Sequence, residues 1–82
     1  MASFFGTRLA NARDKKRLTQ KAIAEKVRIA PSTWSLYEGS RKEPSLAVLR
    51  SICEELNVSA DYLLGFVKEY KPLREEKTNV NK

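Results

Sequence analysis

Apolar residues recur every three or four positions in five short stretches of the chain. This spacing places them on one face of an α-helix, and no stretch alternates with the period of two that is typical of a strand. In the clearest stretch, the helical period places five side chains on one buried apolar stripe: Leu46, Leu49, Ile52, Cys53 and Leu56. The pattern predicts a compact all-α fold of five helices, which cover residues 4–16, 20–27, 31–38, 46–57 and 60–64.

The residues at the ends of these stretches support the same boundaries. Hydroxyl side chains that can accept hydrogen bonds from the first N–H groups of a helix precede four of the stretches: Ser3, Thr19, Ser45 and Ser59. Pro31 suits the first turn of the third helix, where its missing N–H is not needed. Gly65 is placed to end the last helix.

One small domain accounts for the 82 residues, because many chains of about 55 to 65 residues fold unaided. The end of the chain is charged and polar, with too little apolar surface to offset the entropy of an ordered chain. We therefore expect a domain over residues 1–67 and a charged C-terminal tail over residues 68–82 that is largely disordered. We expect no separate sensing domain in the 17 residues after Gly65, so that any regulatory signal would act through a protein partner.

The positive charge is concentrated in the first half of the sequence. Sixteen Lys and Arg against ten Asp and Glu give a net charge of +6. Residues 1–45 hold ten of the basic and four of the acidic side chains, whereas residues 46–82 hold six of each. This asymmetry is expected when one face of a domain meets a polyanion. A net charge of this size is also ordinary for a soluble domain, so charge alone does not decide the function.

Several function classes lack the residues that they require. With one Cys and no His, the sequence has no pair for an internal disulfide and no His-based metal site. It also has no Gly-rich phosphate loop, and its longest nearly apolar run is far shorter than the roughly 20 residues that span a membrane. No secretory signal is recognisable at residues 1–8. We expect a cytoplasmic, non-enzymatic protein without a metal, a cofactor or a membrane partner.

The second and third predicted helices form a distinctive pair. Both are short, and only residues 28–30 separate them, so each must pack on the other at a steep angle to bury its apolar face. Trp34 and Tyr37 are the inward apolar pair of the third helix. Its other side carries small hydroxyls and one aliphatic side chain: Ser32, Thr33, Ser35 and Leu36.

This outward face has two interpretations. Hydroxyls can meet base edges or phosphates, and the Leu36 side chain can meet a thymine methyl, so the face suits the major groove of DNA. An ordinary solvated helix surface would have the same composition. The residue types alone leave both interpretations open.

The combined pattern resembles the lambda-repressor-like, XRE-type or Cro-like, helix-turn-helix domains of phage and bacterial repressors. The resemblance covers roughly residues 5–65 and is carried by Thr19–Val27, Ile29, Ser32–Glu38, Pro44–Leu46 and Leu56–Gly65. It implies a compact five-helix DNA-binding domain whose third helix enters the major groove, usually as a homodimer on a two-fold-symmetric operator. It also implies association with the nucleoid when the protein is bound to DNA.

The resemblance assigns roles to particular residues. It implies that Gln20 contacts a phosphate, that the small Ala24 lets the second and third helices approach, and that Arg13 and Glu38 form a structural salt bridge. Ala30 matches a further position that usually faces base edges. The candidate DNA-binding residues are Gln20, Lys21, Pro31, Ser32, Thr33, Ser35, Leu36, Arg41 and Lys42.

Three positions depart from the pattern of the family. Arg28 stands where a turn Gly is frequent, so it must either accept a conformation that Gly reaches more easily or change the turn. Gly39 comes one residue earlier than the usual Gly of the following loop, which predicts a small difference in loop geometry. Pro31 replaces a polar residue that often reads a base, so specificity is expected to depend more on Ser32, Leu36 and DNA shape.

These observations predict a sequence-specific regulator of transcription that binds double-stranded DNA, most simply a repressor. The alternative is an antitoxin-type or protein-interaction module that uses the same fold mainly to bind a protein partner. An apolar cluster after the fifth helix is expected to share its side chains between the core and a dimer interface: Leu63, Leu64, Phe66 and Val67.

Overall fold

The computed structural model describes residues 4–75 and contains five α-helices over that range. Their bounds are α1 Phe4–Lys15, α2 Gln20–Lys26, α3 Pro31–Glu38, α4 Leu46–Leu56 and α5 Ala60–Leu64. Residues 4–75 include no strand. The prediction of an all-α, five-helix fold is confirmed, and each helix boundary lies within one residue of its predicted position.

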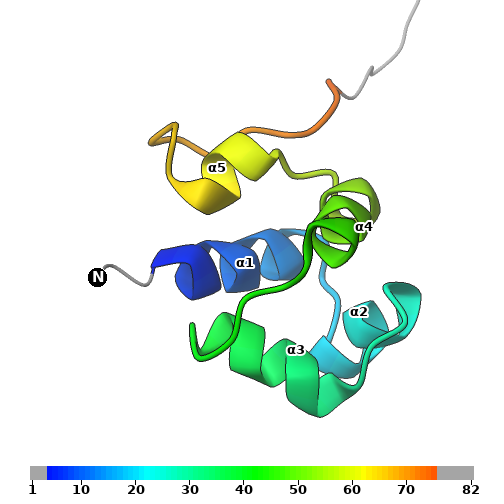
Figure 1. Ribbon diagram of the computed structural model, residues 1–82. Helices are drawn as coiled ribbons and strands as arrows, with labels where there is room; N and C mark the ends of the chain where they lie inside the picture. Colours follow the sequence, from blue (N-terminus) through cyan, green and yellow to red (C-terminus); the bar gives the residue numbers. More distant parts are fainter. Residues whose placement is uncertain (1–3, 76–82) are drawn as a thin grey trace, which may run out of the picture.

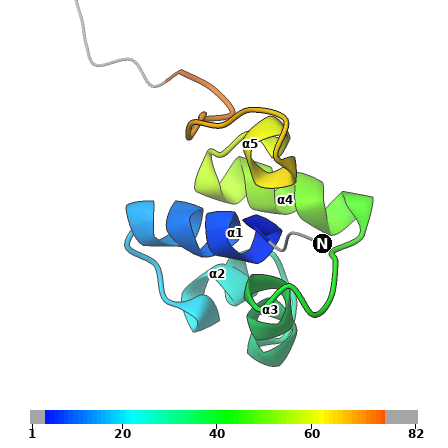
Figure 2. The ribbon, with the colours of Figure 1, turned by 90° about the vertical axis from the view of Figure 1, so that its left-hand side faces the viewer.

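The first helix lies at the centre of the fold. Figure 1 and Figure 2 show α1 between two layers, with α4 and α5 on one side and α2 and α3 on the other. Contacts between elements join α1 to α3 and to α5, and join α2 to α3 and α4 to α5. The pair α2 and α3 therefore forms one edge of the molecule, where one side of α3 is left uncovered.

Side-chain caps set the start of three helices. The hydroxyl oxygens of Thr19, Ser45 and Ser59 accept hydrogen bonds from N–H groups in the first turn of α2, α4 and α5, at 3.0, 3.2 and 3.0 Å. Pro31 occupies the first turn of α3. These predictions are confirmed, whereas the predicted cap at Ser3 lies outside the described residues.

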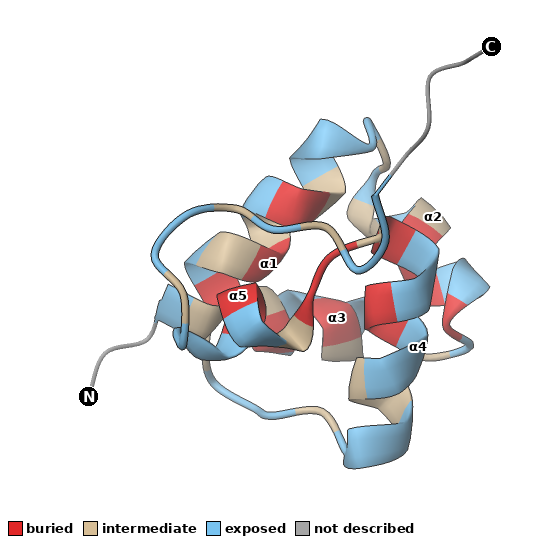
Figure 3. Cartoon of the chain, turned by 90° about the horizontal axis from the view of Figure 1, so that it is seen from above, coloured by how far each residue is buried: buried red, intermediate tan, exposed pale blue. Residues whose placement is uncertain are grey.

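A continuous hydrophobic core joins the five helices. Figure 3 shows that the buried residues lie on the faces that the helices turn toward one another. Leu46 was part of the predicted apolar stripe of α4, and this detail is wrong, because its side chain is 84% exposed. It is the first residue of α4 and lies at the rim of an open groove. The fully buried large side chains are Leu9, Ile23, Trp34, Ile52, Leu56, Val58 and Leu63.

A residue in the left-handed conformation follows each of the five helices. These residues are Arg17, Arg28, Ser40, Asn57 and Gly65, with φ values of 58, 63, 57, 50 and 88°. The left-handed position after α3 is Ser40 and not the preceding Gly39, whose φ is −84°. The left-handed site after α3 is thus occupied by a serine.

The start of α1 packs closely against the end of α3. The Gly6 N–H donates a hydrogen bond to the hydroxyl of Ser40 at 3.1 Å. A Cβ at position 6 would overlap the backbone carbonyl of Glu38. Gly6 therefore lets α1 reach the residues that follow the outward face of α3.

Residues 66–75 lie against α1, α4 and α5. The Ser59 N–H donates to the Lys71 carbonyl at 2.9 Å, and the Asn57 side chain forms hydrogen bonds with the backbone N–H and carbonyl of Arg74 at 2.9 and 3.1 Å. The part of the predicted tail that the structure describes, residues 68–75, thus makes specific contacts with the helices. Residues 76–82 of that segment lie outside the described residues.

Candidate nucleic-acid interface

One face of α3 fixes the helix to the core. Trp34 is fully buried and Tyr37 is 4% exposed, and their rings meet edge to face with centroids 6.3 Å apart. Both side chains were predicted to be core residues, and the burial confirms this. The anchored face determines which residues of α3 point outward.

The opposite face of α3 is open to solvent. Pro31, Ser32, Ser35 and Leu36 are exposed, and Thr33 is half-buried. The Leu36 side chain is 39% exposed, although it is a large aliphatic group. Among these five residues there is no charged side chain and no amide, so hydroxyls and one aliphatic group are what α3 presents.

The turn between α2 and α3 sets the angle of α3. Ala24 is fully buried, as expected for the small residue that lets the two helices approach. Its carbonyl accepts a hydrogen bond from the Ile29 N–H at 3.0 Å. Arg28 adopts the left-handed conformation with φ 63°, so the turn keeps a geometry that glycine adopts more easily and accepts a side chain there.

A carboxylate at the end of α3 binds side chains from three helices. The Glu38 oxygens accept hydrogen bonds from Arg13 Nε at 2.6 Å and Arg13 Nη2 at 3.2 Å, which confirms the implied salt bridge between α1 and α3. They also accept from Trp34 Nε1 at 2.5 Å and from Gln20 Nε2 at 2.8 Å. The Arg13 Nη1 group donates in addition to the Leu18 carbonyl at 2.8 Å.

The four donors keep the buried carboxylate ionised. Burial by itself raises the pKa of Glu38, but hydrogen bonds from Arg13, Trp34 and Gln20, together with the charge of Arg13, outweigh that effect and lower its pKa. The pKa of Arg13 is raised, chiefly by its hydrogen bond to Glu38, against the opposing effect of burial. This network positions α3 relative to α1 and α2.

The side chain of Gln20 makes an intramolecular hydrogen bond in addition to its predicted phosphate contact. It is half-buried at the start of α2, and one hydrogen of its side-chain amide is directed to Glu38. No spacing in the sequence indicated this contact. The indole hydrogen bond of Trp34 had one available signal, the spacing of Trp34 and Glu38 by four residues on one helix.

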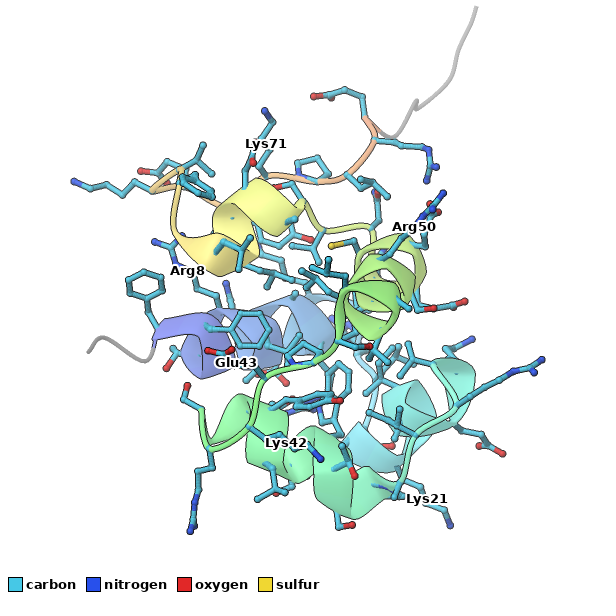
Figure 4. All side chains as sticks on the ribbon, in the orientation of Figure 1. Arg8, Lys21, Lys42, Glu43, Arg50 and Lys71 are labelled. Carbon is cyan, nitrogen blue, oxygen red and sulfur yellow. The ribbon has the colours of Figure 1, made fainter. Side chains whose placement is uncertain are left out.

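Exposed cations lie on both sides of α3. Lys21 is exposed near the start of α2, and Arg41 and Lys42 are exposed in the loop after α3. Figure 4 shows Lys21 and Lys42 on the side of the molecule that α3 forms, whereas Arg50 and Lys71 lie on the far side. The structure therefore brings the nine candidate residues to one edge of the domain, with the amide of Gln20 turned partly inward.

Two arginines of the basic first half serve the fold. Arg13 belongs to the Glu38 network. Arg8 Nη1 donates to the carbonyls of Tyr62 and Val67, both at 2.7 Å, and its guanidinium lies 4.5 Å from the centre of the Tyr62 ring. No spacing in the sequence indicated this role of Arg8. Of the basic side chains in the first half of the sequence, Arg8 and Arg13 are therefore engaged within the fold, so only part of that positive charge remains for a ligand.

Other kinds of site find no support in residues 4–75. No group of three or more His, Cys, Asp or Glu side chains in that range could hold a metal ion. Cys53 is buried on α4, as predicted, and burial, followed by the charge of Glu54, raises the pKa of its thiol. Within the same range, every helix is too short or too polar to cross a membrane.

Two adjacent helices at one edge, the second of them anchored by aromatic residues and uncovered on its outer side, define the class of helix-turn-helix proteins. Residues 6–67 match a family model described as a helix-turn-helix domain. The chain belongs to this family, as the lambda-repressor-like pattern had indicated.

Three proteins of Bacillus subtilis strain 168 are similar in sequence. The HTH-type transcriptional regulator ImmR is 43% identical over 60 residues, which are 73% of this chain and 47% of ImmR. YobD and YqaE, both called uncharacterized HTH-type transcriptional regulators, are 37% identical over 70 residues and 34% identical over 76 residues. These matches cover 85 and 93% of this chain. The chain spans 47 to 66% of the length of these relatives.

A solved structure has the same fold. The crystal structure of the clp gene regulator ClgR from Corynebacterium glutamicum superposes with a TM-score of 0.70 and 34% sequence identity. The match covers 76% of this chain and 66% of the ClgR chain. The arrangement of α1–α5 is therefore shared with a gene regulator.

Proposed function

We propose that this protein binds double-stranded DNA sequence-specifically and regulates transcription, by repression from a two-fold-symmetric operator. One observation carries the proposal: the outward face of α3 is uncovered, is anchored from behind by Trp34, and is flanked by the exposed cations Lys21 and Arg41. The similarity to proteins named as transcriptional regulators supports it. The proposed role is not enzymatic and places the protein on DNA in the cytoplasm.

The exposed chemistry of α3 determines how it reads a sequence. The hydroxyls of Ser32 and Ser35 can donate to or accept from base edges or phosphates, and Leu36 can pack on a thymine methyl. The strongest discrimination between bases comes from bidentate contacts of Arg, Lys, Asn or Gln, and no such side chain faces outward from α3. We therefore assign a large part of the specificity to thymine methyls and to DNA shape.

The flanking residues supply affinity without sequence preference. Lys21, Arg41 and Lys42 are placed to meet phosphates on the two sides of the groove that α3 occupies. Gln20 uses one amide hydrogen for Glu38 and keeps a second one that no described residue accepts. That second N–H is the proposed phosphate donor, in an orientation fixed by Glu38.

The functional unit that we propose is a homodimer formed through an apolar groove. The groove has a volume of about 560 Å³ and lies between the start of α1, the loop after α3, the start of α4 and the end of α5. Around it Phe4, Leu46 and Leu64 are 42, 84 and 48% exposed, which is unusual for large apolar side chains gathered in one place. Leu63 completes the core beneath the groove, while Leu64 stays available at its surface.

A second copy of this chain is the occupant that the charges favour. A two-fold interface brings the same surface of both subunits together, so its charges must be complementary to themselves. The residues that line the groove include one cation, Lys42, and one anion, Glu43, so two copies of this surface meet without net charge, whereas most of the basic first half would repel a second copy. The groove also adjoins the loop after α3, so a dimer formed there would present two α3 helices together.

Selection from a random duplex library at near-physiological salt tests DNA binding. An enriched inverted repeat, with half-sites about one helical turn apart, is the expected result. Duplex binding without enrichment would contradict sequence-specific regulation and favour an architectural role. No binding at all would contradict the DNA-binding function and favour the protein-interaction alternative.

The molar mass in solution tests the dimer. We expect a concentration-dependent dimer that Leu46→Asp converts to a monomer, because Leu46 is exposed in the single chain and its replacement does not disturb the core. Leu36→Asp changes another exposed leucine outside the groove and should leave the dimer intact. A monomer at all concentrations would overturn the proposed dimer and leave the groove to a different protein.

A further inference from the structure

Four of the five left-handed helix ends carry a side chain. Only Gly65 has the residue that enters this conformation without a steric penalty, whereas Arg17, Arg28, Ser40 and Asn57 carry a Cβ there. Glycine at any of these positions would relieve local strain. Strained positions of this kind are a reason to ask what the side chain does.

For two of the four, the fold itself gives the answer. The hydroxyl of Ser40 accepts the hydrogen bond from the Gly6 N–H. The side chain of Asn57 binds both the N–H and the carbonyl of Arg74, and Asn is also tolerant of the left-handed region. Glycine at either position would lose these intramolecular contacts.

The two arginines have no such intramolecular explanation. Arg17 and Arg28 are both exposed, and within residues 4–75 neither guanidinium forms a hydrogen bond, an ion pair or a contact with an aromatic ring. Their backbone N–H groups close the turns by donating to the backbone carbonyls of Asp14 and Glu25, at 2.9 and 3.2 Å. Any residue with a backbone N–H, glycine included, would form these two bonds.

The positions of the two arginines are related. Each lies in one of the two turns that flank α2, as the chain positions show. Figure 1 draws these turns in light blue and teal. Arg17 comes two residues before Thr19, the N-cap of α2, and Arg28 comes three residues before Pro31, the first residue of α3. In helix-turn-helix complexes the first residues of the recognition helix meet the bases and the preceding helix crosses the DNA backbone. Both arginines therefore adjoin the helix starts that face the duplex.

We infer that Arg17 and Arg28 are DNA-backbone contacts that hold α2 between two phosphates, and this inference rests on the proposed DNA-binding function. The guanidinium is always charged and matches the geometry of a phosphate with two parallel hydrogen bonds. A side chain in a turn beside the groove meets the phosphodiester chain before it meets base edges, so these arginines add affinity and not sequence preference. With Lys21, Arg41 and Lys42, they extend the cationic border of α3 to both ends of α2.

Replacing each arginine with glycine separates this role from a structural one. Arg17→Gly and Arg28→Gly remove a charge and at the same time relieve the left-handed strain. We expect each variant to melt about 3–6 °C higher than the parent chain. We expect each to bind a duplex enriched by the library selection about fivefold more weakly at about 0.15 M salt, with a salt slope smaller by about 0.9. If Arg17 and Arg28 had only a structural role, replacing them with glycine would not raise the melting temperature and weaken DNA binding at the same time.

Two further variants serve as controls. Arg28→Lys keeps both the positive charge and the strain, so it should retain the salt slope and the melting temperature of the parent chain and lose only the affinity that the two parallel hydrogen bonds of the guanidinium supply. Arg50→Ala removes the same charge from α4, on the far side of the molecule from α3 (Figure 4). Because Arg50 makes no proposed phosphate contact, Arg50→Ala should show only the small loss of affinity that comes from lowering the net charge by one.

The outcomes distinguish the two proposals. If the parent chain binds the selected duplex and the glycine variants bind as tightly as Arg50→Ala, the assignment of Arg17 and Arg28 is overturned and the DNA-binding function stands. If the parent chain binds no duplex, the function and this assignment fail together. Weaker binding of the glycine variants with unchanged salt slopes would also overturn it, because a lost phosphate contact must release fewer counterions.

Discussion

The amide of Gln20 donates a hydrogen bond to the carboxylate of Glu38 at 2.8 Å, which ties the first residue of α2 to the last residue of α3. The same carboxylate binds Arg13 of α1 and the indole of Trp34. One ionised group thus determines how three helices meet. Because Gln20 is also a proposed phosphate contact, Glu38 determines how the amide of Gln20 is oriented for that proposed role.

Removing the cation from this network should destabilise the domain. Arg13→Ala leaves Glu38 ionised and nearly buried, with side-chain exposure of only 10%, and without its charged partner. Losing one member of a buried pair is expected to reduce the free energy of unfolding by about 3 kcal/mol. Thermal or urea denaturation measures the change directly, with no DNA present.

Asp14→Ala is the matched control for Arg13→Ala. It removes the other acidic partner of Arg13, which lies 3.4 Å away and is 72% exposed. An exposed pair of this kind contributes at most about 1 kcal/mol. Equal melting of the parent chain and Arg13→Ala would contradict the structural role of the Arg13 and Glu38 pair.

The same network gives stability a defined pH dependence. Burial raises the pKa of Glu38, but its hydrogen-bond donors and the charge of Arg13 lower it by more. The pKa in the folded state therefore lies below the ordinary value of 4.5. A carboxyl group of this kind stabilises the fold above its unfolded pKa, and the stabilisation is lost as pH falls through the folded pKa. We expect the difference in unfolding free energy between the parent chain and Glu38→Gln to be constant near about pH 7 and to shrink below about pH 4.5.

A second carboxyl group changes in the same direction and must be separated from the first. The pKa of Glu54 is lowered by its hydrogen bond and ion pair with Arg74, both at the surface. Glu54→Gln should therefore keep the acid-dependent loss that Glu38→Gln removes. A difference between the parent chain and Glu38→Gln that stays constant into strong acid would show that the Glu38 pKa is not lowered.

The sequence was sufficient to predict the helices, three of their N-caps and the buried face of α3, because periodic apolar residues and capping hydroxyls act locally. It did not reveal that Gln20 and Trp34 meet at Glu38, since a shared carboxylate depends on how three helices pack. Arg8 was counted with the basic residues for the same reason. Its three carbonyl partners, on Tyr62, Val67 and Lys68, are distant in the sequence and have no side-chain signature.

The proposed base contact of Leu36 predicts a loss that depends on sequence. Leu36→Ala should weaken binding to the selected operator by about 1–3 kcal/mol and leave binding to random duplex nearly unchanged. The fold should tolerate the change, because Leu36 is 39% exposed. Competition binding with operator and random duplexes measures the two affinities.

Arg41→Ala provides the contrast to Leu36→Ala. Arg41 is exposed in the loop after α3, and its loss should weaken all duplexes to a similar extent and reduce the salt slope by about 1. Equal losses on operator and random DNA for Leu36→Ala would overturn its assignment to base readout. The pair of variants thus separates specificity from general affinity on the same helix and its loop.

The close approach of α1 to α3 predicts a high sensitivity at Gly6. Gly6→Ala places a Cβ against the backbone carbonyl of Glu38, and neither helix can yield without disturbing the network there. Overpacking of this kind should reduce the free energy of unfolding by about 1–3 kcal/mol, although alanine favours a helix over glycine. Gly39→Ala meets only ordinary contacts and should be nearly neutral, so similar melting of the two variants would contradict the prediction.

Arg8 of α1 holds the segment that follows α5. Arg8 holds the carbonyls of Tyr62 and Val67 with a charged donor, and the backbone then returns to α5 where the Ser59 N–H binds the Lys71 carbonyl. Arg8→Ala should release residues 66–75, lower the free energy of unfolding by about 2 kcal/mol and increase hydrogen exchange at the Ser59 amide. Arg41→Ala, at an exposed arginine in the loop after α3, should leave that amide protected. If Ser59 exchanged equally slowly in both variants, Arg8 would not be the residue that holds the segment, and its packing would depend on the Asn57 and Arg74 contacts instead.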